Sequence, residues 1–154
     1  MGIFNPKKFH ILMIGLEYSG KLSIILGLKT GKWPSIPHIG LSNETVEYKR
    51  LIINNFDINE ETRKFLDYYE NKFGINGIIF VFDSSNNTEE AMKELNILLN
   101  KYNCPFLIFA NKSDLVKYEI KIDFKDKTYK IINTNAIKGE GIYEGLDWLN
   151  TIIF

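Results

Sequence analysis

The chain has 154 residues, 45% of them hydrophobic and 25% charged, which is the profile of a globular domain of ordinary size. Nineteen basic and nineteen acidic residues cancel, so no net field favours nucleic acid, and we expect no nucleic-acid partner. The single cysteine, Cys104, excludes an internal disulfide and fits a reducing compartment. No apolar run approaches the ~20 residues of a membrane-spanning helix, and the N-terminus lacks the long apolar segment of a secretory signal. We treat residues 1–154 as one domain.

Apolar runs and helical repeats alternate along the chain. Continuous or alternating apolar runs predict strands over 8–15, 44–50, 51–57, 77–83, 104–110 and 128–135. Apolar residues at helical spacing predict helices over 20–29, 61–73, 86–103 and 141–154. Strands that alternate with helices pair in parallel through right-handed crossovers, whereas 44–50 and 51–57 are close enough for a hairpin. We therefore expect an α/β fold with a mostly parallel six-stranded sheet, one antiparallel hairpin and helices on both faces.

The stretch "GLEYSGKLS", from Gly15 to Ser23, has the G-x-x-x-x-G-K spacing of a phosphate-binding loop and lies between a predicted strand and a predicted helix. Glycines allow backbone N–H groups to curl around a phosphate, and Lys21 can reach the β- and γ-phosphates. The hydroxyl residue that should follow the lysine is replaced by Leu22. The alternative is a glycine-rich turn with a surface lysine.

A second motif, "NKSD", follows the predicted strand "CPFLIFA" and spans Asn111 to Asp114. A carboxylate at Asp114 can accept hydrogen bonds from both N1–H and the exocyclic amine of guanine, a pairing that adenine does not offer. Asn111 can hold the loop or touch the base, and the stem of Lys112 can lie over it. The alternative is a solvated polar turn, because all four residue types are common in turns.

With these two motifs, the sequence resembles the ADP-ribosylation factor (Arf) branch of the small GTPases. The resemblance runs over nearly the whole chain, through "ILMIGLEYSGK", "SIPHIGLSNETVEYK", "GIIFVFDSS", "NKSD" and "GEGIYEGLDWL". Its most specific parts are "ETVEYK" and "YEGLDWL". It implies a P-loop domain that binds GTP and GDP, with phosphate contacts from Gly15, Tyr18, Ser19, Gly20, Lys21, Leu22 and Ser23, and base contacts from Asn111, Lys112, Asp114, Ala136 and Ile137. In the family, the position of Ala136 offers a backbone N–H to the guanine carbonyl.

The chain departs from the family where a metal ion would be held. The family's Mg²⁺ takes one hydroxyl at the position of Leu22 and a second at the position of His38, and Mg²⁺ demands oxygen ligands in octahedral geometry. Asp57 matches the aspartate that holds a magnesium-bound water. We therefore expect no direct metal ligand among these residues.

Residues 57–61, which match the segment called the second switch in the family, also depart from it. The family has Asp-x-Gly-Gly-Gln at these positions, and this chain has "DINEE". Glu61 stands at the position of the glutamine that orients the attacking water, and Glu60 at that of a γ-phosphate-binding glycine. Either Glu61 acts as a general base, or both glutamates are a solvated helix start, where acidic side chains favour the helix dipole. We assign no catalytic residue.

The membrane and partner surfaces are altered too. Gly2 is placed for myristoylation, which would give weak membrane association. The three positions at which the family docks effectors with aromatic side chains hold Leu41, Phe56 and Asn71. Trp33 is either an exposed anchor of the first switch or a packing residue.

The sequence thus indicates a divergent Arf-like GTP-binding protein in vesicle-mediated and intracellular protein transport, with weak or lost GTP hydrolysis. We expect a monomer in the cytoplasm, peripheral on the Golgi or another endomembrane, that works with protein effectors and an exchange factor. The rival hypothesis is a non-enzymatic pseudo-GTPase scaffold, locked with GDP or free of nucleotide. A P-loop kinase is disfavoured by the "NKSD" loop.

Overall fold

A six-stranded sheet forms the centre of the protein. The computed structural model describes residues 7–33, 45–113, 115–124 and 126–153. The strands lie in the order β2-β3-β1-β4-β5-β6, with β2 and β3 antiparallel and every other neighbouring pair parallel. Their bounds are β1 Phe9–Gly15, β2 Thr45–Tyr48, β3 Leu51–Asp57, β4 Gly77–Asp83, β5 Phe106–Asn111 and β6 Tyr129–Thr134. The predicted fold class, with its single antiparallel hairpin, is confirmed.

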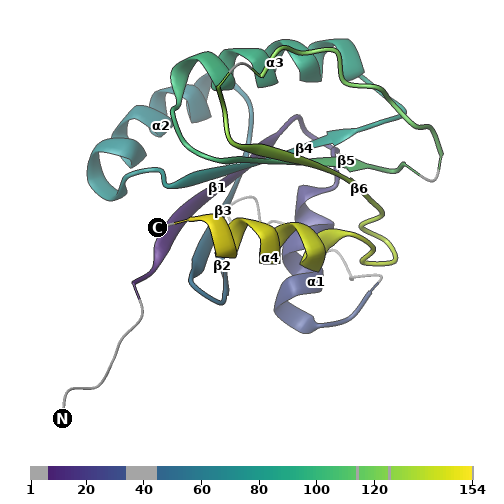
Figure 1. Ribbon diagram of the computed structural model, residues 1–154, viewed down its shortest axis with the longest axis horizontal. Helices are drawn as coiled ribbons and strands as arrows, with labels where there is room; N and C mark the ends of the chain where they lie inside the picture. The colour runs from purple at the N-terminus through teal and green to yellow at the C-terminus, as the bar shows by residue number, and fades with distance from the viewer. Residues whose placement is uncertain (1–6, 34–44, 114, 125, 154) are drawn as a thin grey trace.

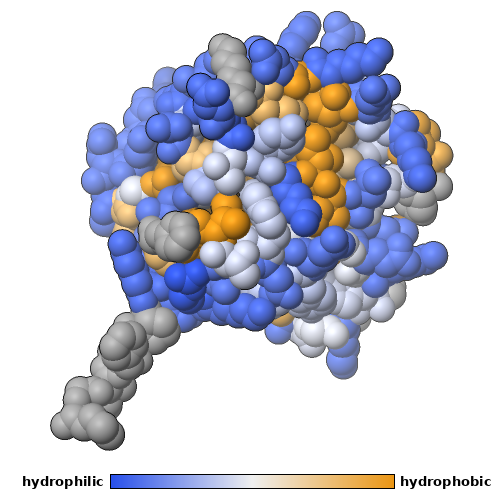
Figure 2. Space-filling model, in the orientation of Figure 1, coloured by the Kyte–Doolittle hydropathy of each residue, from blue (hydrophilic) through white to orange (hydrophobic). Residues whose placement is uncertain are grey.

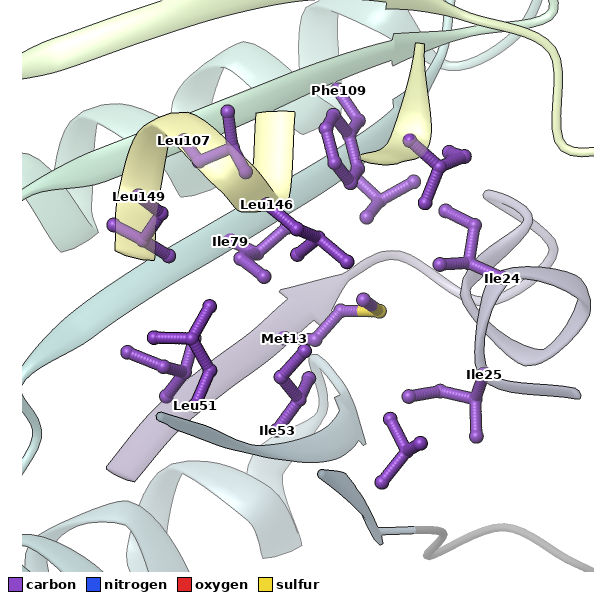
Figure 3. Close-up of a cluster of buried hydrophobic side chains, with 14 of the residues drawn as sticks. Met13, Ile24, Ile25, Leu51, Ile53, Ile79, Leu107, Phe109, Leu146 and Leu149 are labelled. Carbon is purple, nitrogen blue, oxygen red and sulfur yellow. The ribbon is translucent and has the colours of Figure 1, made fainter. Parts of the chain in front are cut away.

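Helices cover both faces of this sheet (Figure 1). They are α1 Lys21–Thr30, α2 Glu60–Phe73, α3 Thr88–Lys101 and α4 Ile142–Ile152. The apolar side chains of α1 and α4 share one buried cluster with β1, β3, β4 and β5, and those of α2 and α3 share a second cluster on the other face. Figure 3 shows the first cluster, in which Ile24 and Leu146 point toward Met13 and Ile79 of the sheet. Burial of these aliphatic groups drives the layers together.

Local sequence explains where the helices begin and end. Asn59 and Thr62 form a capping box at the start of α2, with Asn59 Oδ1 accepting from Thr62 N and Thr62 Oγ1 accepting from Asn59 N, both at 2.9 Å. Gly31 ends α1 in the left-handed conformation that favours glycine, and its N–H donates to Gly27 O. The described residues between β5 and β6 contain no helix.

The turn of the β2–β3 hairpin is bound to the C-terminal helix. Tyr48 Oη and Lys49 Nζ both donate to Asp147 Oδ1 at 2.6 Å, and the backbone N–H of Arg50 donates to Asn150 Oδ1 at 3.2 Å. The hydrogen bonds from Lys49 and Tyr48 lower the pKa of Asp147 below its usual value. These contacts join elements that are distant in sequence and fix the hairpin against α4.

The face of the molecule shown in Figure 2 is mainly hydrophilic, with hydrophobic patches between the polar side chains. Tyr129 and Ile131 of the edge strand β6 are among the exposed hydrophobic residues. Among the residues that the structure describes, no helix is both long enough and apolar enough to span a bilayer.

Leu146 tests the packing of α4 on the sheet, because its side chain is fully buried. Leu146→Ala should lower the free energy of unfolding by about 2–5 kcal/mol, since it leaves a cavity in the first cluster. Ile97→Ala on α3 is the matched control, because the Ile97 side chain is 53% exposed and its truncation should cost far less. Urea unfolding followed by circular dichroism measures both. Equal losses for the two variants would contradict the packing described for α4.

Candidate functional site

The predicted site residues meet at the carboxyl ends of the parallel strands. The strand register places Gly15 beside Asp57, and it places Asn111 between Asp83 and Thr134. Ile58 N donates to Gly15 O at 3.0 Å, which joins the end of β3 to the start of the phosphate loop. This edge of an open α/β sheet is where such folds bind ligands.

The phosphate loop needs glycine at positions 15 and 20 for steric reasons. A Cβ added to Gly15 would lie 2.2 Å from Val81 O of the neighbouring strand. A Cβ added to Gly20 would lie 2.0 Å from Asn111 Nδ2, and Gly20 also has a φ of 108°. Tyr18 has a φ of 65° and an exposed side chain, whereas Ser19 is buried. The loop is therefore packed directly against β4 and β5.

Lys21 turns back over the phosphate loop and is almost fully buried. Its Nζ donates to Leu16 O at 2.8 Å and to Ser19 Oγ at 3.1 Å, and it forms an ion pair with Asp57 Oδ1 at 2.7 Å. Burial lowers the pKa of Lys21, and the hydrogen bond and charge of Asp57 oppose that effect. An ammonium has three N–H donors, so these three acceptors match its donors in number.

Asn111 links the phosphate loop to the opposite side of the site. Its buried side chain donates from Nδ2 to Ser19 O at 2.9 Å. Its Oδ1 accepts from Ala136 N at 3.1 Å and from Thr134 Oγ1 at 3.2 Å. Of the two roles considered for Asn111, the structure therefore places it in the first, holding the loop.

Lys112 lies in the left-handed conformation, with a φ of 57°, and its Nζ donates to Asp83 Oδ2 at 2.8 Å. Asp83 Oδ1 accepts from both N and Oγ of Ser85. Burial raises the pKa of Asp83, but the hydrogen bonds from Lys112 and Ser85 outweigh it and leave the pKa below its usual value. The sequence analysis did not identify Asp83. Its position at the end of "GIIFVFD", level with Asn111, is the signal that points to it.

The loop that carries Ala136 and Ile137 is closed by the side chain of Asn135. Asn135 Oδ1 accepts from Ile137 N at 3.1 Å and from Lys138 N at 3.3 Å, and the backbones of Asn135 and Glu140 are paired. Ala136 is buried, whereas the Ile137 side chain is 64% exposed. The contact of the Ala136 N–H with a guanine carbonyl stays a prediction, because that N–H donates to Asn111 here. We call residues 135–140 the base loop below.

The described residues beside Lys21 do not fit a magnesium ion. Leu22, the second residue of α1, has no oxygen to offer, and the carboxylate of Asp57 already pairs with Lys21. Ser23 is the next residue of α1 and is half-buried. No group of three histidine, cysteine or acidic side chains suited to a metal ion occurs among the described residues.

The two glutamates of the second switch lie in the first turn of α2, and both are exposed. Their place directly after the N-cap Asn59 agrees with the interpretation of a solvated helix start. Phe56, one of the three effector positions, is buried against Phe65 and Tyr69, and Asn71 is exposed. The predictions for Gly2, His38, Leu41 and Asp114 fall outside the described residues.

Trp33 is a packing residue, which decides between the two roles considered for it. The side chain is half-buried and packs against the first buried cluster.

Cys104 lies partly buried at the second cluster, and burial raises the pKa of its thiol to about 12. A thiol with this pKa is not a candidate nucleophile.

Asn111→Ala tests whether this amide joins the two sides of the site. The variant removes the partner of Ser19 O, of the Ala136 N–H and of the Thr134 hydroxyl, so it should destabilise the fold by roughly 2–4 kcal/mol. Asn133→Ala is the matched control, because Asn133 is exposed on β6. Thermal unfolding by calorimetry measures both. An Asn111→Ala protein as stable as the control would show that the network contributes little.

Comparison with known protein families agrees with this arrangement. The model of the ADP-ribosylation factor family matches residues 2–153, which is nearly the entire chain. The match confirms the resemblance inferred from the motifs, and it includes the phosphate loop, the "NKSD" loop and the base loop. The chain belongs to the ADP-ribosylation factor family of small GTPases.

Proposed function

We propose that this chain is a guanine-nucleotide-binding regulator of membrane traffic with weak or lost GTP hydrolysis and impaired magnesium ligation. Family membership supports the nucleotide-binding part. The observation that carries the rest is the ion pair between Lys21 and Asp57, next to Leu22. The phosphate and base sides of the site are joined through Asn111, whereas Leu22 offers no hydroxyl at the metal side.

The ion pair affects how strongly Lys21 can bind a γ-phosphate. Lys21 and Asp57 lie 2.7 Å apart at their charged atoms, so a phosphate that binds Lys21 has to compete with a carboxylate. Unit charges ~4 Å apart interact by about 1 kcal/mol in water and by several times that near a protein surface. Leu22, beside this pair, has no hydroxyl for a metal ion, and the two exposed glutamates at the start of α2 add negative charge. Both features disfavour GTP hydrolysis.

The rival function is a non-enzymatic scaffold, free of nucleotide or locked with GDP. One observation favours it: all three donors of the Lys21 ammonium have protein acceptors. Mass spectrometry of nucleotide released from the purified protein separates the two. Copurified GTP supports weak hydrolysis, GDP a resting or locked form, and absence of nucleotide the scaffold.

The cellular part of the proposal rests on the family and on the N-terminal sequence. We infer a monomeric cytoplasmic protein, peripheral on the Golgi or another endomembrane, with weak attachment through Gly2. Family membership suggests protein effectors and an exchange factor as partners. Fractionation of cells that express the wild type and Gly2→Ala tests the attachment.

Removal of magnesium should leave nucleotide binding nearly unchanged. Because Leu22 and the paired Asp57 are poor magnesium ligands, EDTA should change the GDP dissociation rate by less than about threefold. Single-turnover GTP hydrolysis should be slow with and without Mg²⁺. Fluorescent GDP release and quenched-flow assays measure the two rates.

Leu22→Thr restores the missing hydroxyl and should make GDP release more sensitive to EDTA. Leu28→Thr is the control, because it makes the same change farther along α1. Fast magnesium-dependent hydrolysis by the wild type would overturn the proposal.

A further inference from the structure

Trp33 lies between two glycines that belong to different parts of the site. A Cβ added to Gly27 would lie 2.2 Å from Trp33 Cζ3, at the six-membered ring of the indole. A Cβ added to Gly139 would lie 2.8 Å from Cδ2 and Cγ, at the five-membered ring. The indole therefore touches both backbones at once, and neither position has room for a side chain.

The first of these glycines belongs to the helix that follows the phosphate loop. Gly27 is buried in the middle of α1, where glycine costs roughly 1 kcal/mol relative to alanine. The gain that offsets this cost is contact between the α1 backbone and the indole. Lys21 begins the same helix, so Trp33 rests on the element that carries the phosphate-binding lysine.

The second glycine belongs to the base loop. Gly139 has a φ of 75° and lies in the turn that Asn135 closes. Asn111 and Asn135 hold this loop by hydrogen bonds, and Trp33, three residues after the end of α1, adds a packing contact. The Tyr143 ring, at the start of α4, meets Trp33 edge to face with 6.2 Å between ring centroids. The indole is thus enclosed by α1, the base loop and α4.

We infer that Trp33 is a positioning residue for the guanine base: it holds the base loop at a set distance from α1, so that base and phosphate contacts form together. The inference rests on the proposed nucleotide binding and adds a residue that acts through the base loop. A tryptophan suits this task because it offers a large rigid contact area with only two side-chain torsions.

The readout that separates positioning from general stability is the affinity for ligands with and without a base. Trp33→Ala should weaken GDP binding about fivefold to tenfold while leaving the affinity for inorganic pyrophosphate unchanged. Competition with fluorescent GDP measures both ligands on the full-length protein. Trp33→Phe should restore part of the GDP affinity, because a smaller ring still fills part of the gap between Gly27 and Gly139.

Two further variants keep the test decisive if Trp33→Ala folds poorly. Gly27→Ala retains the tryptophan and forces it to move, since the new Cβ would overlap the ring, and alanine favours the helix. It should lower the ratio of GDP to pyrophosphate affinity as Trp33→Ala does. Trp148→Phe is the matched control: Trp148 packs on the same cluster from α4 and should leave the ratio unchanged.

The outcomes of this experiment distinguish the inference from the proposed function. If the wild type binds no GDP, the proposed function fails. If the wild type binds GDP but Trp33→Ala and Gly27→Ala leave the ratio unchanged, or weaken GDP and pyrophosphate equally, the positioning role is wrong. A lower ratio in both variants, with the Trp148→Phe ratio unchanged, supports it.

Discussion

The buried amide of Asn111 is bonded to the phosphate loop on one side and to β6 and the base loop on the other. Because Nδ2 donates to Ser19 O while Oδ1 accepts from Thr134 and Ala136, one planar group sets the distance between the two sides of the site. An amide is suited to this place, since a carboxylate could not donate to Ser19 O and a buried charge would be costly. The close approach of Gly20 to Nδ2 follows from the same arrangement.

The metal side of the site is organised by charge. A nearly buried ammonium at Lys21 requires a counter-charge and hydrogen-bond acceptors, and Asp57, Leu16 and Ser19 provide them. The carboxylate of Asp57 is thereby engaged with Lys21 through Oδ1. Leu22, which follows Lys21 in α1, has no oxygen to offer at this side of the site.

The sequence predicted the parts of the site that depend on strand ends and local motifs. The strand ends after Gly15 and Asn111 were expected at one edge of the sheet, because parallel strands bring their carboxyl ends together, and the structure places them there. Their contacts with nucleotide stay a prediction. The pairs Lys21–Asp57 and Lys112–Asp83 could not be predicted, since each depends on the register between strands and on how far a flexible lysine bends.

The fold, like the site, has features that local sequence predicts and features that depend on packing between distant elements. Hydrophobic patterns in the sequence predicted the strands and helices of the described residues, but not that Phe56 would be buried under the aromatic side chains of α2, because that depends on how α2 packs on the sheet. Trp33 was ambiguous for a related reason: a lone aromatic residue outside any repeat gives no sign of what it packs against.

Three glycines, at positions 20, 27 and 139, are best understood together. At each of them an added Cβ would meet a side chain that joins two parts of the site: the Asn111 amide at Gly20, and the Trp33 indole at Gly27 and Gly139. Asn111 sets the distance between the two sides by hydrogen bonds, and Trp33 sets it by van der Waals contact. Both side chains need a neighbouring residue without a side chain. The phosphate side and the base side are thus held together at two separate places, at Asn111 and at Trp33. Nucleotide that bridges these sides would meet a frame already formed, and preorganisation of this kind favours binding because less has to be ordered when the ligand arrives.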